Sequence, residues 1–299
     1  MPTRIESVGL SCATWGAIGG GARRLAVRAA ERCLRQAGSR PSDIDLLLNA
    51  GLYREDGLAE PALAALIQGD LGAHPGDPPW STPGTFSFDV NNGGCSVLNA
   101  VHIVEALFAG GTAHRALVVA SDAVSHGPRA NGLGFRRVGG ALLLSPSTGA
   151  GGFVDFHFES APEHEDLFVG EIRWNGDGRP GNALVLEEKP EFARRCVECA
   201  AVACDAFLAR VGLDPAEVEL LVASQYPPNF ANDLARSIGI SESRVARAAG
   251  RFRGAHTAGP IAALGAAMEG GRFHGASRTL FALVGSGISV ALALYRSEH

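Results

Sequence analysis

An internal repeat is the feature of this sequence that most constrains its fold. Residues 31–48 read ERCLRQAGSRPSDIDLLL, and residues 205–222 read DAFLARVGLDPAEVELLV. At a constant offset the two segments match at these positions: Leu34 with Leu208, Gly38 with Gly212, Pro41 with Pro215, Ile44 with Val218, and Leu46-Leu47 with Leu220-Leu221. A glycine after a helical pattern, a proline in the next turn and then an apolar run predict a helix, a turn and a buried strand in each segment.

A second pair of units occurs later in the chain, in the same order. Residues 97–111 form a helical pattern that ends in Gly-Gly before an apolar run, and residues 261–271 do the same. Two matching units in one order predict a duplicated domain. The alternative is that helix–turn–strand units resemble one another in any protein of this class. A polar stretch at 159–191 has the character of a connection, so we expect two halves, 1–160 and 161–299.

Strand and helix patterns alternate along the chain. The expected strands are Ile44–Leu48, Phe86–Val90, Ala116–Ala120, Val138–Leu144, Leu220–Ala223 and Thr279–Val284. The expected helices are Leu25–Gln36, Val97–Phe108, Phe192–Val211 and Ile261–Glu269. With 299 residues, of which 46% are hydrophobic, the chain can bury a large core. This alternation predicts an α/β protein with a mainly parallel, buried sheet.

Composition argues against several functional classes. The formal net charge is −5 and no stripe of Lys and Arg stands out, which disfavours a nucleic-acid partner. No apolar run reaches the roughly 18 residues of a membrane span, and the first residues lack a secretory signal pattern. The six cysteines are too scattered for a disulfide framework, and a lone Cys196-x-x-Cys199 predicts no bound metal. We therefore expect a soluble, cytoplasmic protein without a membrane partner.

The segment with the strongest chemical signal is Phe86–Phe108, FSFDVNNGGCSVLNAVHIVEALF. A strand pattern ends at Asp89, a polar, glycine-rich turn follows, and Cys95 stands where a helix begins. Free amides and the positive end of the helix dipole at such a position favour the thiolate, which is the nucleophilic form of cysteine. A buried structural cysteine at a helix start is the alternative, and the residues alone leave both interpretations open.

This segment resembles the active-site stretch of the thiolase superfamily. The similarity is greatest to the β-ketoacyl-ACP synthase III branch, whose pattern is D-(V/I)-x-x-A-C-(S/A)-G followed by a helix, a glycine and an L-V-V-(G/A)-(S/A)-(E/D) strand. Asp89, Cys95, Gly111 and Asp122 fit this pattern if the turn carries one extra residue. The stretch LFALVGSGISVALAL near the C-terminus resembles the family's closing hairpin, whose turn supplies an oxyanion-hole amide, here that of Ser286. The resemblance implies a duplicated thiolase fold with five layers, α-β-α-β-α, and Cys95 as the nucleophile.

The family uses a Cys–His–Asn triad, and this sequence departs from it. Ser224 stands at the position of the family histidine, and Gln225 is retained after it. His256 takes the position of the family asparagine if a gap of two residues is allowed, and Thr257 then matches the family threonine. A Cys95–His256 pair with backbone oxyanion donors would support acyl transfer, whereas decarboxylation needs further donors for an enolate. The alternative for His256 is a structural residue that caps the following helix.

The resemblance thus implies an acyltransferase that loads an acyl group onto Cys95 and passes it to an acceptor in a specialised biosynthetic pathway. The donor would be acyl-CoA or a phosphopantetheinyl acyl carrier protein, with Ser224, Gln225 and Ser286 lining the site and no bound cofactor. Two alternatives stay open: a decarboxylative β-ketoacyl condensing enzyme, and a catalytically impaired subunit of a heterodimeric ketosynthase. The family's strand before the nucleophile, here Phe86–Val90, pairs across a two-fold axis. We therefore expect a homodimer, or a heterodimer where a paralogous ketosynthase is present.

Overall fold

The computed structural model describes residues 2–13, 21–54, 60–73, 84–123, 135–174 and 182–297. The first part of the chain contains β1 (Thr3–Cys12), α1 (Ala22–Gln36), β2 (Leu46–Asn49), α2 (Leu63–Leu71), β3 (Phe86–Asp89), α3 (Ser96–Ala109), β4 (Ala116–Ser121) and β5 (Val138–Pro146). The second part contains β6 (Gly152–His164), β7 (Phe168–Trp174), β8 (Asn182–Glu188), α4 (Phe192–Arg210), β9 (Leu220–Ala223), α5 (Phe230–Ser237), α6 (Gly259–Glu269), α7 (Arg272–Gly275), β10 (Arg278–Gly285) and β11 (Gly287–Arg296).

The strand order repeats between the two parts. Nine strands form one sheet in the order β3-β2-β4-β5-β1-β6-β11-β10-β9. Read outward from the centre, β1-β5-β4-β2-β3 corresponds to β6-β11-β10-β9, and a single bridge between Leu221 and Val245 stands where the fifth strand would be. The two half-sheets meet where Thr3 of β1 pairs with Phe153 of β6. The expected duplication is therefore confirmed.

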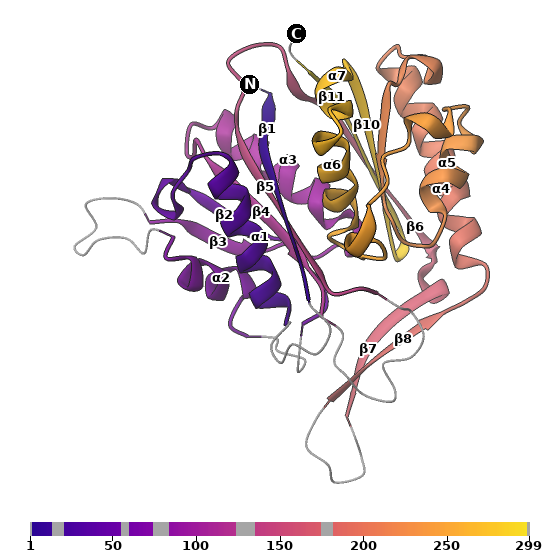
Figure 1. Ribbon diagram of the computed structural model, residues 1–299. Coiled ribbons are helices and arrows are strands. Elements are labelled where there is room, and N and C mark those ends of the chain that lie inside the picture. The colour runs from indigo at the N-terminus through magenta and orange to yellow at the C-terminus, as the bar shows by residue number, and fades with distance from the viewer. Residues whose placement is uncertain are drawn as a thin grey trace.

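Helices and half-sheets alternate in five layers. Helices α3 and α6 lie between the two half-sheets and share one apolar core with both of them (Figure 1). A second core packs α1 and α2 on the outer face of the first half-sheet, and a third packs α4 and α5 on the outer face of the second. This is the predicted α-β-α-β-α arrangement of a thiolase fold.

Small residues bring α1 directly onto its half-sheet. A Cβ atom at Gly9 of β1 would lie 2.0 Å from the carbonyl oxygen of Ala29, and one at Gly139 of β5 would lie 2.4 Å from that of Leu25. The alanine-rich helix and these two glycines therefore allow a backbone-to-backbone approach that larger side chains would prevent.

The sheet is mixed, which corrects the expectation of a mainly parallel one. The β2–β3, β2–β4 and β9–β10 pairs are parallel. The β1–β5, β1–β6, β4–β5, β6–β11 and β10–β11 pairs are antiparallel. The expected strands and helices are all present, most of them with shifted ends, but several elements, including β1 and β6, were not predicted. Charged and exposed positions along most of β6 hide its strand pattern.

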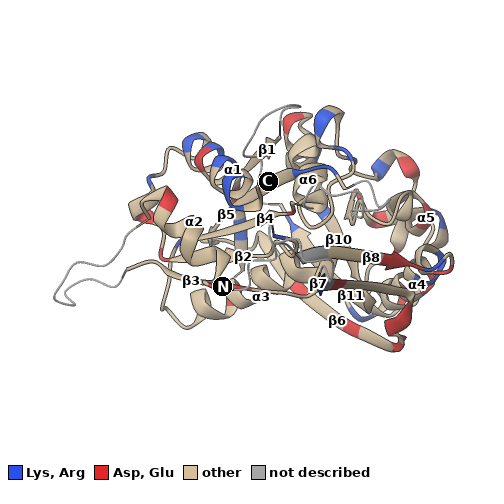
Figure 2. Cartoon of the chain, turned by 90° about the horizontal axis from the view of Figure 1, so that it is seen from below, with Lys and Arg blue, Asp and Glu red and all other residues tan. Residues whose placement is uncertain are grey.

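The polar stretch 159–191 is only partly a connection. Its first residues extend β6, where Glu159 pairs with Val290 and His164 pairs with Gly287 of β11. The rest forms the two-stranded β7–β8 hairpin, and Asp and Glu residues lie on β8 and toward the end of β6 (Figure 2). The division of the chain at residue 160 stays a prediction, and β6 runs across it. Within the described residues no helix is both long and apolar enough to span a membrane.

Candidate active site

A small cavity with both polar and apolar wall residues lies where the carboxyl ends of strands from both halves meet. Its volume is ≈ 20 Å³, and its wall contains Leu52, Tyr53, Gly93, Gly94, Phe168, Phe192, Ser224, Tyr226, Pro227, His256, Val284, Gly285 and Ser286. Open α/β sheets place ligands at the carboxyl ends of their strands, so the location fits a functional site. Of the predicted site residues, the small cavity brings together His256, Ser224 and Ser286. Cys95 and Gln225 are not part of its wall.

His256 lies beside a buried carboxylate that sequence reasoning did not pair with it. Asp122 follows β4, and its Oδ2 atom is 3.4 Å from Nδ1 of His256. The same oxygen accepts hydrogen bonds from the amide and the hydroxyl of Thr257, at 2.8 and 2.6 Å. Its other oxygen accepts from the amides of Leu52 and Tyr53 at 3.0 and 2.9 Å. Asp122 thereby fixes the loop that carries His256.

The charge of Asp122 is stable in this setting. Burial alone would raise the pKa of Asp122, but its contact with His256 and its bonds from Thr257 and the Tyr53 amide outweigh burial and bring the pKa to about 2. The carboxylate is therefore ionised at neutral pH. A carboxylate next to Nδ1 favours the proton on that nitrogen and leaves Nε2 as the acceptor. Among the described residues, no hydrogen bond to Nε2 competes for it.

Aromatic rings surround His256. The ring centroids of Phe135, Tyr53 and Tyr226 lie 4.6, 5.3 and 5.9 Å from that of the imidazole. The histidine side chain is only 10% exposed. With the carboxylate of Asp122 on one edge and rings around it, the imidazole has little freedom to rotate.

Ser224 and Gln225 follow β9 and have different roles. The Ser224 hydroxyl accepts a hydrogen bond from the amide of Val284 at 3.0 Å and lines the small cavity. The Gln225 side chain donates to the carbonyl of Ala223 at 3.0 Å and accepts from the amide of Ala248 at 3.1 Å. Both ends of the Gln225 side-chain amide are therefore hydrogen-bonded, and this side chain connects the end of β9 to the segment at Ala248.

The structure places Cys95 outside the small cavity. Its side chain is fully buried, and Sγ lies 3.5 Å from the carbonyl oxygen of Leu283 and 3.4 Å from that of Ser289, on β10 and β11. Burial raises the pKa of the Cys95 thiol far above its usual value. Loss of solvent therefore opposes the thiolate that the helix start was expected to favour. Cys95 is a core residue in this structure.

Gly94 faces the small cavity in place of Cys95. Counting the family pattern from Asp89 without an insertion places its cysteine at residue 94, and that spacing could have revealed the difference. A Cβ atom at Gly94 would lie 2.1 Å from the carbonyl oxygen of Val284 and 3.7 Å from Oγ of Ser224. The turn is thus packed against β10 with no space for a side chain. No thiol of the described residues lines this cavity.

The β7–β8 hairpin covers the small cavity, which the sequence did not indicate. Phe168, at the start of β7, is part of the cavity wall. The hydroxyl of Tyr226 donates a hydrogen bond to the carboxylate of Glu188 on β8. A Cβ atom at Gly170 of β7 would lie 3.2 Å from the hydroxyl oxygen of Tyr53. The hairpin therefore rests on two of the rings that surround His256.

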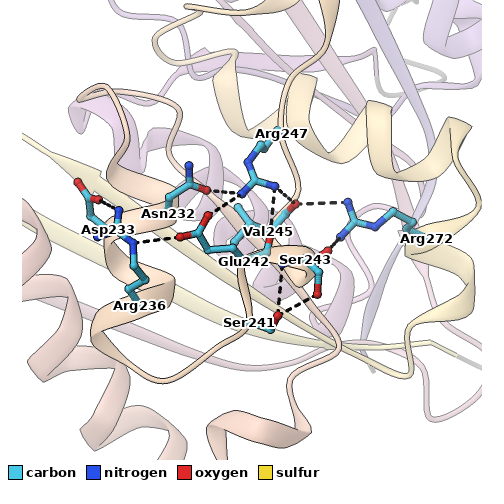
Figure 3. A network of polar contacts seen from close by, with 9 residues as sticks. All are labelled: Asn232, Asp233, Arg236, Ser241, Glu242, Ser243, Val245, Arg247 and Arg272. Carbon is cyan, nitrogen blue, oxygen red and sulfur yellow. Dashed lines mark hydrogen bonds and ion pairs between the residues drawn. The ribbon is translucent and has the colours of Figure 1, made fainter.

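A larger, open cleft adjoins the small cavity. This outer cleft has a volume of ≈ 540 Å³ and shares Ser224 and Tyr226 with the small cavity. Arg247 on its wall is held by Asn232 at 2.6 Å and by Glu242, within a network of polar contacts around α5 (Figure 3). Arg253, also on its wall, is exposed and has no ion-pair partner among the described residues. The described residues form no cluster of His, Cys, Asp or Glu that could hold a metal ion.

Comparisons with known proteins find relatives with one name. No protein-family model matches the chain. Over 280 residues it is 26% identical to a protein named β-ketoacyl-[acyl-carrier-protein] synthase III from Granulibacter bethesdensis, covering 91% of this chain and 83% of that protein. It is also 26% identical over 300 residues to a protein of the same name from Rhodospirillum rubrum, covering 97% and 89%.

Solved structures share the fold at lower identity. The 3-oxoacyl-(acyl carrier protein) synthase III of Pseudomonas aeruginosa superposes with a TM-score of 0.83 at 18% identity, covering 100% of this chain and 99% of that one. OleA of Xanthomonas campestris with bound cerulenin superposes with a TM-score of 0.82 at 17% identity, covering 99% and 97%. Both superpositions extend over nearly the whole length of each chain.

Proposed function

We propose that this chain, a thiolase-superfamily protein that resembles β-ketoacyl-ACP synthase III, transfers acyl groups from a thioester donor to an acceptor. The donor would be acyl-CoA or a phosphopantetheinyl acyl carrier protein, and the pathway a specialised biosynthetic one. The observation that carries the proposal is the small cavity at the junction of the halves, where His256 lies beside the ionised Asp122. The donor would occupy the outer cleft, with its reacting carbonyl where that cleft meets the small cavity at Ser224 and Tyr226.

This proposal does not use an acyl-Cys95 intermediate. Cys95 is buried on the other side of the turn, and the residue that faces the cavity is a glycine. Decarboxylative condensation is also less well supported, because Ser224 stands where the family has a histidine and the cavity wall contains a single imidazole. The donors that remain for a developing oxyanion are backbone amides of the cavity wall, such as that of Ser286.

Turnover and intact mass can be measured together to test the proposal. The protein and its Cys95→Ala variant are incubated with acetyl-CoA, octanoyl-CoA and the corresponding acyl carrier proteins, with water and short alcohols as acceptors. We expect catalysed release of the donor thiol, no acyl adduct on the protein, and the same rate in both proteins. An adduct that Cys95→Ala abolishes would restore the acyl-cysteine route, and no turnover with any donor would refute acyl transfer.

A catalytically impaired subunit is the second candidate, and Gly94 is the observation that favours it. A chain that lacks a thiol in its cavity could shape the site of a cysteine-bearing paralogue. In that case the chain alone would be inactive and would co-purify with a co-expressed ketosynthase from the same source. Activity of the isolated chain would argue against this candidate.

We also propose that the chain is a homodimer. Strand β3 lies at the edge of the nine-stranded sheet, and Phe86 at its start is 61% exposed. An edge strand with an exposed aromatic residue is well suited to pair with a second chain.

A further inference from the structure

We propose that His256 and Asp122 form a general-base dyad that activates a hydroxyl acceptor for direct attack on the bound thioester. The inference rests on the proposed acyl transfer and names its acceptor class and its chemical route. Transfer would then be a single displacement, with no covalent enzyme intermediate.

The geometry of the dyad supports the first half of this inference. Nδ1 of His256 is buried and lies 3.4 Å from the Asp122 carboxylate, and it has no hydrogen-bond partner among the described residues. Asp122 is itself held by donors from Thr257, Leu52 and Tyr53, so it cannot swing away from the imidazole. The carboxylate thus acts as a positioning residue that keeps Nε2 free to accept a proton on the cavity side.

The route is balanced without any further reactant. The acceptor oxygen attacks the thioester carbonyl carbon, forming a C–O bond while Nε2 of His256 takes the hydroxyl proton. The charge on the carbonyl oxygen would be received by backbone donors of the cavity wall, and Ser286 is one of the residues that could supply such an amide. The C–S bond then breaks, and the imidazolium returns its proton to the departing sulfur. The products are an ester and a free thiol.

The cavity favours a hydroxyl over other acceptors. A volume of ≈ 20 Å³ holds a group of about the size of one water molecule next to the imidazole. Phe168, Phe192 and Val284 contribute apolar wall, which disfavours a charged ammonium group. An alcohol has no ionised form at neutral pH and depends on a general base, whereas a thiol supplies its own thiolate.

Because alcohols depend on a general base and thiols do not, comparing the two acceptors tests the dyad. The protein is incubated with acetyl-CoA and either primary alcohols or matched primary thiols of two to six carbons. The products, esters from the alcohols and exchanged thioesters from the thiols, are quantified by mass spectrometry. The rates without protein are subtracted. We expect His256→Ala to lower ester formation by about 10²–10⁴-fold while thiol exchange stays within about 3-fold. Asp122→Asn is expected to lower ester formation by at least about 10-fold and to leave thiol exchange unchanged.

Two control variants separate catalysis from folding. His274→Ala removes an exposed histidine on α7 and should leave both reactions unchanged. Thr257→Val removes one hydrogen bond to Asp122 but keeps both residues of the dyad. The rates of this variant therefore show how much of a loss in activity comes from a less stable structure. Equal losses of ester formation and thiol exchange in His256→Ala would overturn the dyad but leave acyl transfer standing. Absence of both reactions in the unaltered protein would instead refute the proposed function itself.

Discussion

Asp122 and Thr257 are joined by two hydrogen bonds across the junction of the two halves of the molecule. The Thr257 amide and hydroxyl donate to one carboxylate oxygen at 2.8 and 2.6 Å. Asp122 follows β4 of the first half, and Thr257 precedes α6 of the second. The other carboxylate oxygen accepts hydrogen bonds from the amides of Leu52 and Tyr53, so one buried charge connects three segments of the chain.

Removing the Thr257 hydroxyl should destabilise the protein. A hydrogen bond to a buried charge contributes about 1.5–3 kcal/mol, so Thr257→Val should lower the free energy of unfolding by that amount in urea titrations. Thr279→Val is the matched control, because the buried Thr279 hydroxyl has no hydrogen-bond partner in the described part of the chain. That variant should be neutral or slightly stabilising. Equal effects of the two substitutions would contradict a special role for the Asp122–Thr257 pair.

Protonation of Asp122 at acid pH should lower the free energy of unfolding. The pKa of Asp122 is lowered to about 2 from an ordinary value of 3.8. A group whose pKa is lowered in the folded state stabilises it above the ordinary pKa, and this stabilisation is lost as the pH falls toward the folded value. We expect a loss of about 2–3 kcal/mol between pH 5 and pH 2 that is absent from Asp122→Asn. Parallel pH profiles of unfolding free energy for both proteins would refute this assignment.

Cys95 should be chemically inert in the folded protein. Its thiol is fully buried, whereas Cys12 and Cys199 are partly exposed. Iodoacetamide at neutral pH should therefore label Cys12 and Cys199 first, and Cys95 only after unfolding in urea, as followed by peptide mass mapping. Labelling of Cys95 ahead of the others under native conditions would show that the turn opens and exposes the thiol.

Much of the fold could be predicted, because the repeat and the apolar runs indicate where helices, turns and buried strands form. The expected strand Leu220–Ala223 coincides with β9, and Phe192–Val211 differs from α4 by one residue. Strand β6 escaped prediction because its charged, partly exposed residues carry no clear alternation. Long-range pairing with β11, not local pattern, determines it.

The site was predictable only in part. Ser224 and His256 were identified because each aligns with a family motif, and both line the small cavity. The position of Cys95 in the core was not foreseen, because a shift of one residue in the turn decides whether a side chain faces the cavity or the core. The Asp122–His256 contact joins residues 134 positions apart in the sequence, and no local signal reports such a pair.

Gly94 should resist replacement. A Cβ atom there would lie 2.1 Å from the carbonyl oxygen of Val284, so Gly94→Ala forces the turn or β10 to move and should cost about 1–3 kcal/mol. Gly94→Cys, which restores the family residue by the insertion-free alignment, should destabilise at least as much. Gly69→Ala in α2 is the control, since no atom lies within 4 Å of its Cβ position, and it should be neutral or stabilising. Thermal unfolding of all three variants tests this, and a tolerated Gly94→Cys that gains an acyl adduct would show that the site can accept a nucleophile.

The edge strand β3 should carry the subunit contact. Phe86 is 61% exposed and contacts Phe88 on the same strand, with ring centroids 5.0 Å apart, so the strand presents aromatic surface beside unpaired backbone groups. A glutamate at this position would place a charge in any interface built on the strand, so Phe86→Glu should convert the proposed dimer to a monomer in light scattering at micromolar concentration. Val202→Glu on α4 is the matched control, because Val202 is 67% exposed on the outer helical layer and should tolerate the charge without a change in mass. A monomeric unaltered protein would refute the dimer, and a Phe86→Glu variant that stays dimeric would move the interface away from β3.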